Sequence, residues 1–235
     1  NYIKSGLIIG GFLFCAYFTQ TTGVMLEMPG KSQFLSSAYC VFVPFIGGLI
    51  FREKPKKYHI VAATLCATGI ILVSVVGTFS VSIGDSISIL SSLCWATQIV
   101  AIAKWGKDKD PGLITLLQFM VAAILAWVFT LTQEQSSSIE INQRVIFGVL
   151  YLGIVCSGLC FLLQTISQKT ESPTSVSIIL SFENIFGIIF SILFFNEHMT
   201  VNKAIGFVLM FTAILISELQ PNFLKDKADV HIDNE

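Results

Sequence analysis

One acidic residue, Glu183, lies in the middle of a long apolar run. It is nine residues from one end of the stretch 174–195 and twelve from the other. A carboxylate at the middle of a bilayer costs about 3 kcal/mol on insertion scales, so we expect it to face protein and to be protonated or hydrogen-bonded. Two chemistries follow, exchange of a proton or recognition of a substrate amine or hydroxyl. A packing role through one hydrogen bond to a neighbouring helix is the structural alternative.

The other candidate ligands of a small molecule are uncharged polar or aromatic residues within apolar runs. Tyr17 precedes Gln20 by three residues and Trp95 precedes Gln98 by three, so each pair shares one face of a helix. Hydrogen bonding between helices, at about 0.6 kcal/mol each, is the alternative role for such side chains. The candidate set for substrate binding or coupling is Glu183, Gln20, Gln164, Tyr39, Trp95, Gln98, Gln118, Tyr17 and Asn184.

No arrangement of residues indicates catalysis, a metal site or a cofactor. The sequence lacks the metalloprotease, nucleophile-elbow and phosphate-loop motifs, so we predict neither an enzyme nor a chain that drives ATP hydrolysis itself. Cys156 and Cys160 are one helical turn apart, but no histidine or second cysteine pair accompanies them. The six cysteines all lie in apolar runs and are interpreted as small buried hydrophobes.

The composition indicates where these residues must be held. Of 235 residues, 54% are apolar and 12% are charged. Soluble domains carry about 25% charged residues. The mean hydropathy is +0.77. This balance excludes a soluble enzyme and a disordered chain, and a net charge of −1 excludes a nucleic-acid binder. The lipid bilayer is therefore the expected partner.

The apolar runs predict eight transmembrane helices and an all-α, polytopic membrane protein. Each run reaches the length of about 17 residues or more that spans a bilayer, and none alternates as a strand does. The predicted spans are 5–25, 31–51, 58–76, 84–104, 112–132, 145–168, 174–195 and 202–219. Residues 221–235 are predicted to form a polar cytoplasmic tail.

Lysine and arginine placement predicts the orientation. With the start of the chain in the cytoplasm, eleven of the fourteen basic residues lie on the cytoplasmic side. The outer side holds Lys31, Arg144 and Lys203. The positive-inside rule therefore places the C-terminus in the cytoplasm.

The chain also repeats itself. A shift of 144 residues pairs 6–74 with 150–218 without a gap, and loops fall on loops. The two copies are offset by five membrane crossings. Because this number is odd, they have opposite orientations in the membrane, as in secondary transporters. Spans 84–104 and 112–132 have no partner. We therefore expect a five-plus-five protein whose first two helices are absent here, with a natural eight-helix protein as the alternative.

This repeat gives the predicted domains and pairs the candidate residues. Residues 1–76 are the remnant of a first repeat and 77–220 are a complete second repeat. Gln20 then corresponds to Gln164, which favours a place for both at the repeat interface. Glu183 corresponds to Tyr39, so the two halves differ chemically at this position.

Two stretches resemble EamA-type carriers of the drug/metabolite transporter superfamily. The first runs from Phe34 to Phe51 and contains Tyr39-x-Val41-Phe42-Val43-Pro44, followed by Arg52-Glu53; the second is Ser181-Phe182-Glu183-Asn184-Ile185-Phe186, followed by Phe195-Asn196-Glu197. The resemblance implies ten helices in two inverted repeats, the bacterial cytoplasmic membrane, and transport of small metabolites without ATP. Asn184 replaces the family's usual proline, and Arg52 and Asn196 replace a common glycine.

Together these patterns predict a secondary transporter that moves small metabolites by alternating access. Amino acids and drug-like compounds are the candidate substrates, export is favoured over uptake, and protons are the candidate coupling ion. A structural or regulatory membrane protein, or a subunit of a membrane enzyme, is the alternative.

Overall fold

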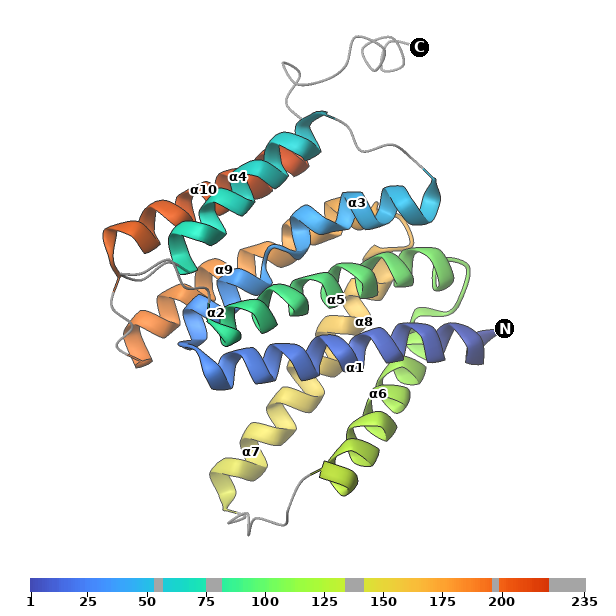
Figure 1. Cartoon of the computed structure of the whole chain (residues 1–235). Coiled ribbons are helices and arrows are strands. Elements are labelled where there is room, and N and C mark those ends of the chain that lie inside the picture. The colour runs from blue at the N-terminus through green and yellow to red at the C-terminus, as the bar shows by residue number, and fades with distance from the viewer. Residues whose placement is uncertain (53–56, 75–81, 134–141, 196–198, 220–235) are drawn as a thin grey trace, which may run out of the picture. The chain divides into compact units, whose positions relative to one another are not determined.

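The computed structural model describes residues 1–52, 57–74, 82–133, 142–195 and 199–219 (Figure 1). These residues are almost entirely helical and contain no strand. The helices are α1 (Tyr2–Leu26), α2 (Pro29–Ser36), α3 (Tyr39–Phe51), α4 (Lys57–Ser74), α5 (Ile83–Trp105), α6 (Pro111–Gln133), α7 (Gln143–Tyr151), α8 (Cys160–Ser167), α9 (Pro173–Phe195) and α10 (Val201–Leu219), with a π-helical segment (Leu152–Leu159) between α7 and α8.

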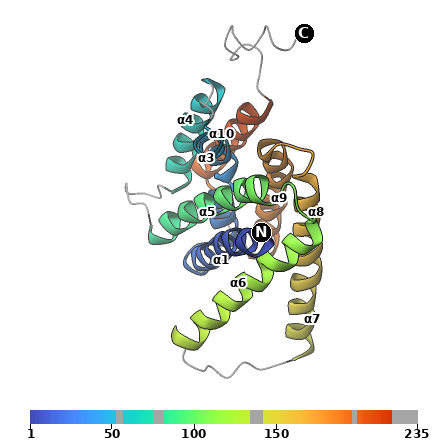
Figure 2. The same cartoon turned by 90° about the vertical axis from the view of Figure 1, so that its right-hand side faces the viewer.

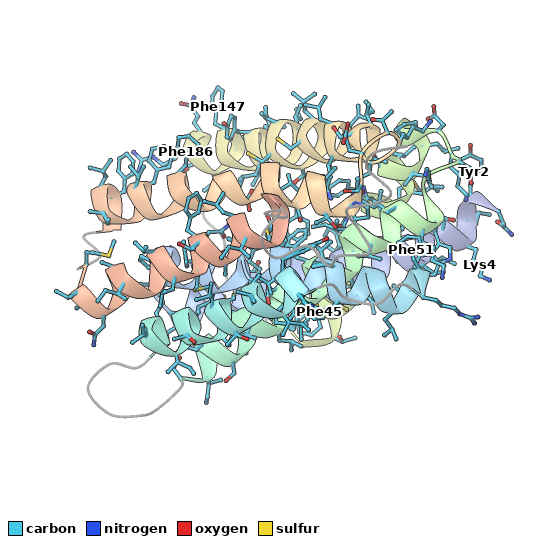
Figure 3. All side chains as sticks on the ribbon, turned by 90° about the horizontal axis from the view of Figure 1, so that it is seen from above. Tyr2, Lys4, Phe45, Phe51, Phe147 and Phe186 are labelled. Atoms are coloured by element: carbon cyan, nitrogen blue, oxygen red, sulfur yellow. The ribbon has the colours of Figure 1, made fainter. Side chains whose placement is uncertain are left out.

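Over the residues that the structure describes, every predicted span falls on a helix or on consecutive helices, which confirms an all-α, polytopic membrane protein. Five helical stretches of the described residues are long and apolar enough to cross a bilayer. Large apolar side chains point outward from several helices, as Phe147 of α7 and Phe186 of α9 do in Figure 3. They are 74% and 58% exposed. In a bilayer such faces meet lipid, which explains why apolar side chains can remain at the surface.

The predicted span 31–51 lies in the stretch Pro29–Phe51, which is long and apolar enough to cross a bilayer, but its helix is interrupted once. The helix stops at Ser36 and starts again at Tyr39. At the break, the Ser37 amide donates to the carbonyls of both Gln33 and Phe34, and the Ser37 hydroxyl also donates to the Phe34 carbonyl. The Ala38 and Cys40 amides likewise donate to carbonyls three residues back, so the backbone leaves the regular α-helical pattern here.

The described helices divide into two compact units. The first unit comprises Asn1–Phe14 and Ala101–Ser172. Its core contains Ile9, Ile102 and Ile114. In this unit α6 packs against α8, and Figure 2 shows α6 and α7 separating from the point where α6 meets α8.

The second unit comprises Cys15–Val100 and Pro173–Glu235. Here α4 packs along α10, and α2 and α3 pack against α9 (Figure 1). One apolar core joins Phe34, Ala62 and Met210, and a second joins Tyr39, Ile99 and Ile214. Both cores hold in place the helices that carry the polar residues described below.

Helix bounds in the second unit recur at the spacing found in the sequence. Adding 144 to the ends of the broken helix Pro29–Phe51 gives 173 and 195, which are the ends of α9. The same addition moves α4 (Lys57–Ser74) to 201–218, one residue short of the end of α10. Similar local sequence thus begins and ends helices at equivalent positions.

Candidate functional site

Four side chains from four helices form a continuous hydrogen-bonded chain in the second unit. The Trp95 indole Nε1–H donates to Gln20 Oε1 at 2.9 Å. Gln20 Nε2–H donates to Gln33 Oε1 at 2.8 Å, and Gln33 Nε2–H donates to Glu183 Oε1 at 3.1 Å. The chain therefore joins α5, α1, α2 and α9. We call these four residues the polar relay.

The indole determines the direction of the polar relay. An indole N–H can only donate, so Gln20 must present its oxygen to Trp95 and its amide N–H groups to Gln33. Gln33 must then present its own oxygen to Gln20, which leaves its N–H groups for Glu183. The carboxyl group of Glu183 thus accepts at the end of the chain. A donor directed at a carboxylate oxygen stabilises its negative charge.

Tyr17 packs on the tryptophan end of the polar relay. The ring centroids of Tyr17 and Trp95 are 5.2 Å apart and the ring planes meet at 74°, which is an edge-to-face arrangement. Tyr17 lies one helical turn before Gln20 on α1, so that helix supplies both a ring and an amide to Trp95. The packing holds the indole in the orientation that its hydrogen bond needs.

Gln33 connects the relay and was not predicted from the sequence. It is the third residue of the predicted span 31–51, and the criterion that selected the other glutamines, an amide within an apolar span, would have selected it too. Its approach to α9 depends on Gly187, one turn after Glu183. A Cβ atom at Gly187 would lie 3.2 Å from Gln33 Cγ. A small residue there leaves room for the glutamine side chain.

Glu183 is exposed in the structure, although it lies in the middle of α9. Gln20, Gln33, Tyr17 and Trp95 are half-buried. In the part of the chain that the structure describes, no lysine or arginine lies within ion-pair distance of Glu183. The Glu183 carboxylate thus accepts one hydrogen bond from the protein and is also accessible to a ligand at the surface of the helix packing.

A second polar cluster in the same unit contains a buried ion pair. Lys31 Nζ lies 2.7 Å from Asp85 Oδ1 and 3.4 Å from Glu27 Oε2. Lys31 and Asp85 are 5% and 0% exposed. The sequence predicted neither contact, because lysine at the end of a span was interpreted only as a sign of orientation. We call Glu27, Lys31, Ser82 and Asp85 the charged cluster.

Asp85 also caps the start of α5. Its backbone N–H donates to Ser82 Oγ at 3.0 Å, and Asp85 Oδ2 accepts from the Ser82 N–H at 3.2 Å. This reciprocal pair is a capping box. The Ser82 hydroxyl also bonds to Glu27, which ties the end of α1 to the start of α5. Asp85 therefore caps the start of α5 and also forms the ion pair with Lys31.

Buried serines continue the contact between α2 and α5. Ser32 Oγ and Ser88 Oγ are 2.9 Å apart, and Ser36 Oγ donates to the Ser88 carbonyl at 3.4 Å. Helix α2 therefore carries three consecutive polar residues, Lys31, Ser32 and Gln33, each bound to another helix. The orientation of this short helix is fixed by polar contacts on several sides.

The remaining candidate residues lie outside the hydrogen bonds of the polar relay named above. Tyr39 is 6% exposed and packs in the apolar core with Ile99 and Ile214. Gln98 is fully buried on α5. The backbone of Asn184 lies in α9, but its side chain is outside the described part of the structure, as are Glu53 and Glu197.

Gln118 and Gln164 belong to the first unit. Both are buried, on α6 and α8. Next to Gln164, the Thr165 hydroxyl lies 3.3 Å from the Thr115 hydroxyl, so the two helices also share a polar contact. These residues place amide groups within the helix packing of their own unit.

Among the described residues, no three histidine, cysteine, aspartate or glutamate side chains are close enough to hold a metal ion together. The side chains of the polar relay and Tyr17 are two amides, two aromatic rings and one carboxylate. This set can hydrogen-bond a polar organic molecule or hold a positive charge.

The chain is similar to several membrane transporters. A protein of Archaeoglobus fulgidus described as an uncharacterized transporter is 25% identical over 217 residues, 92% of this chain and 69% of that protein. The uncharacterized transporter YoaV of Bacillus subtilis is 22% identical, over 92% of this chain and 76% of its own length. Protein PecM of Dickeya dadantii is 21% identical, with 92% and 72% covered.

A solved crystal structure shares the fold. It aligns with a TM-score of 0.68 at 15% identity and covers 94% of this chain and 78% of that chain. The pattern of the EamA-like transporter family matches residues 82–219, which is more than half of the chain. The resemblance in sequence is thus confirmed: this multi-pass membrane protein belongs to the EamA-like transporter family.

Proposed function

We propose that this protein is a secondary transporter that moves small metabolites across the cytoplasmic membrane by alternating access. The observation that carries the proposal is the polar relay Trp95–Gln20–Gln33–Glu183, whose four residues lie in four of the predicted membrane spans. Family membership and the transporter names of its relatives support the same general activity.

The chemistry of the polar relay suits a transport site. Polar side chains within membrane spans are costly unless they bond to one another or to a ligand. Here the half-buried amides are paired, while the carboxylate at the end is accessible. Such a site can exchange protein contacts for contacts with a substrate, because each protein hydrogen bond is worth only about 0.6 kcal/mol in a membrane protein.

The pairing of contacts in the second unit supports an inverted repeat, an arrangement common in transporters that work by alternating access. Gln33 on α2 bonds to Glu183 on α9. A shift of 144 residues exchanges these positions for Ser177 and Tyr39. Next to Tyr39, Cys40 Sγ donates to the Ser177 carbonyl at 3.2 Å. The two segments therefore contact each other twice, and the shift of 144 residues relates one contact to the other to within one residue. Two halves related by a pseudo-two-fold axis are expected to show such paired contacts.

In this proposal Glu183 is the group that exchanges a proton or contacts the substrate. Gln20 and Gln33 orient the carboxylate, and the Tyr17–Trp95 pair forms an aromatic wall. Export from a bacterial cytoplasm, with the C-terminus on the cytoplasmic side, is the direction and location that we propose.

Flux through proteoliposomes tests the proposal. Purified protein is reconstituted and assayed for saturable uptake or counterflow with a panel of labelled amines, amino acids and aromatic metabolites. We expect at least one saturable flux in wild type and its loss in Gln33→Leu, which breaks the polar relay. Gln143→Leu, a matched change at an exposed amide, should transport normally. Properly inserted protein without flux of any compound would favour the structural or enzyme-subunit alternative.

A further inference from the structure

Glu183 presents one carboxylate oxygen that the described protein does not use. Oε1 accepts the hydrogen bond from Gln33. Oε2 has no hydrogen bond to any residue that the structure describes, and the side chain is exposed. A ligand that reaches this oxygen can therefore donate to it without displacing Gln33.

The direction of the polar relay suits a positively charged ligand. Because Trp95 can only donate, the succession of amides ends with an N–H group of Gln33 directed at Glu183. This donor stabilises a negative carboxylate. A carboxylate within a membrane span then gains most from a ligand that brings a positive charge.

The same segments contain no free basic group for an acidic ligand. Lys31 is the only lysine or arginine in residues 15–36, 83–100 and 173–195, which contribute the polar relay and Tyr17. Lys31 is buried and is bound to Asp85 and Glu27. The carboxylate of an amino acid or an organic acid would find no counter-charge in these segments.

Aromatic rings lie at the other end of the polar relay. Tyr17 and Trp95 are edge to face, and both are half-buried. Aromatic side chains provide apolar contact area and also attract cations through their faces. An aromatic body on the ligand matches this end, while an ammonium group matches Glu183.

We propose, on the basis of the transport function above, that the polar relay and Tyr17 bind an aromatic primary amine as a monocation, with Glu183 as its counter-charge. The amine donates to Glu183 Oε2, and the aromatic side chains of Tyr17 and Trp95 favour a ligand that carries an aromatic ring. The site selects against zwitterions and acids because the segments that contribute its residues contain no lysine or arginine other than the paired Lys31. This narrows the substrate class from small metabolites in general to amines.

Three probes with the same phenyl ring test the selectivity. Phenethylamine, 2-phenylethanol and phenylalanine are titrated calorimetrically into the full chain in lipid nanodiscs at neutral pH, with empty nanodiscs subtracted. Phenethylamine should bind about tenfold or more tightly than the other two probes. Equal or tighter binding of phenylalanine, or no binding of phenethylamine, would overturn the assignment.

Two variants test the role of the carboxylate. E183Q keeps the size and the acceptor oxygen but removes the charge, and it should lose the preference for phenethylamine over 2-phenylethanol. E171Q changes an exposed glutamate outside the site and should keep it. An unchanged preference in a monodisperse E183Q protein would contradict the proposal. Where E183Q does not fold, the ranking of the three probes on wild type still decides.

Binding and flux separate this inference from the transport function. Phenethylamine binding without flux of any panel compound would support the amine site and contradict transport. Saturable flux of another compound, without preferential binding of phenethylamine, would support transport and overturn the amine site.

Discussion

Lys31 and Asp85 form an ion pair of 2.7 Å between α2 and α5, in a position where neither residue is more than 5% exposed. A buried pair of this kind is weak support for stability as a whole, but its two charges depend on each other. Removal of the Asp85 charge leaves the buried Lys31 with only the more distant Glu27 carboxylate at 3.4 Å. The pair therefore makes the contact between α2 and α5 sensitive to single substitutions.

Asp85→Asn should destabilise the protein by about 3–5 kcal/mol, because Lys31 loses its closest counter-charge. Thermal unfolding of purified protein in detergent measures the effect. Asp108→Asn, at an exposed position, is the control and should change little. The double variant Lys31→Met/Asp85→Asn should recover much of the loss, since it removes both charges while asparagine can still accept from the Ser82 N–H. A double variant as unstable as Asp85→Asn would contradict a role for the lysine that has lost its closest counter-charge.

Adjacent glycines in α1 should respond differently to the same substitution. A Cβ atom at Gly10 would lie 2.7 Å from the carbonyl oxygen of Gln118, whereas a Cβ atom at Gly11 would meet nothing within 4 Å. Gly10→Ala should therefore cost about 1–3 kcal/mol through overpacking against α6. Gly11→Ala should be neutral or should stabilise by about 0.5–1 kcal/mol through better helix propensity. Equal unfolding temperatures for the two variants would refute the close approach of α1 and α6.

Trp95→Phe should weaken transport while leaving the protein folded. The phenyl ring keeps the contact with Tyr17 but cannot donate to Gln20, so the direction of the polar relay is no longer determined. We expect a raised KM and a loss of stability of about 0.6 kcal/mol, the usual value of such a hydrogen bond in a membrane protein. Trp127→Phe, at a residue that is 66% exposed, is the matched control. The same KM in wild type and Trp95→Phe would show that the indole donor has no role at the site.

Glu183→Gln should abolish proton-coupled transport together with its dependence on pH. The substitution keeps an acceptor for the Gln33 N–H but removes the proton that can be exchanged. Flux is measured in proteoliposomes with and without an imposed pH gradient, at matched protein content. Transport that persists with the same dependence on pH would exclude Glu183 as the coupling group. If only Glu183→Ala fails, through loss of protein, the residue serves packing instead.

Cysteine accessibility in intact cells tests the predicted orientation. In a background without the six native cysteines, Lys56→Cys should resist an impermeant thiol reagent, because the basic segment 52–57 is expected in the cytoplasm. Gln135→Cys should react, because the segment after α6 is expected outside. Both positions lie beyond the described residues, so the result depends on topology alone. The opposite labelling pattern would reverse the orientation.

The positions of the membrane helices could be predicted from the sequence because they depend on local properties. Continuous apolar runs of sufficient length form helices in a bilayer, and the short polar separators end them. The repeat spacing of 144 residues, found from sequence matches alone, recurs in the bounds of α9 and α10. The interruption at Ser37 was not predicted because hydropathy does not report a local change in the backbone hydrogen bonds.

Which polar side chains meet was decided by the tertiary structure. The sequence identified Tyr17, Gln20, Trp95 and Glu183 only as separate candidates. The packing of α1, α2, α5 and α9 connects three of them through Gln33 and places Tyr17 against the Trp95 indole. Gln33 and Glu183 are 150 residues apart in the chain, and Lys31 and Asp85 are on different helices. Hydropathy reports how well a segment suits lipid, whereas a hydrogen bond depends on the distance and direction between two atoms. That geometry exists only once the helices have packed.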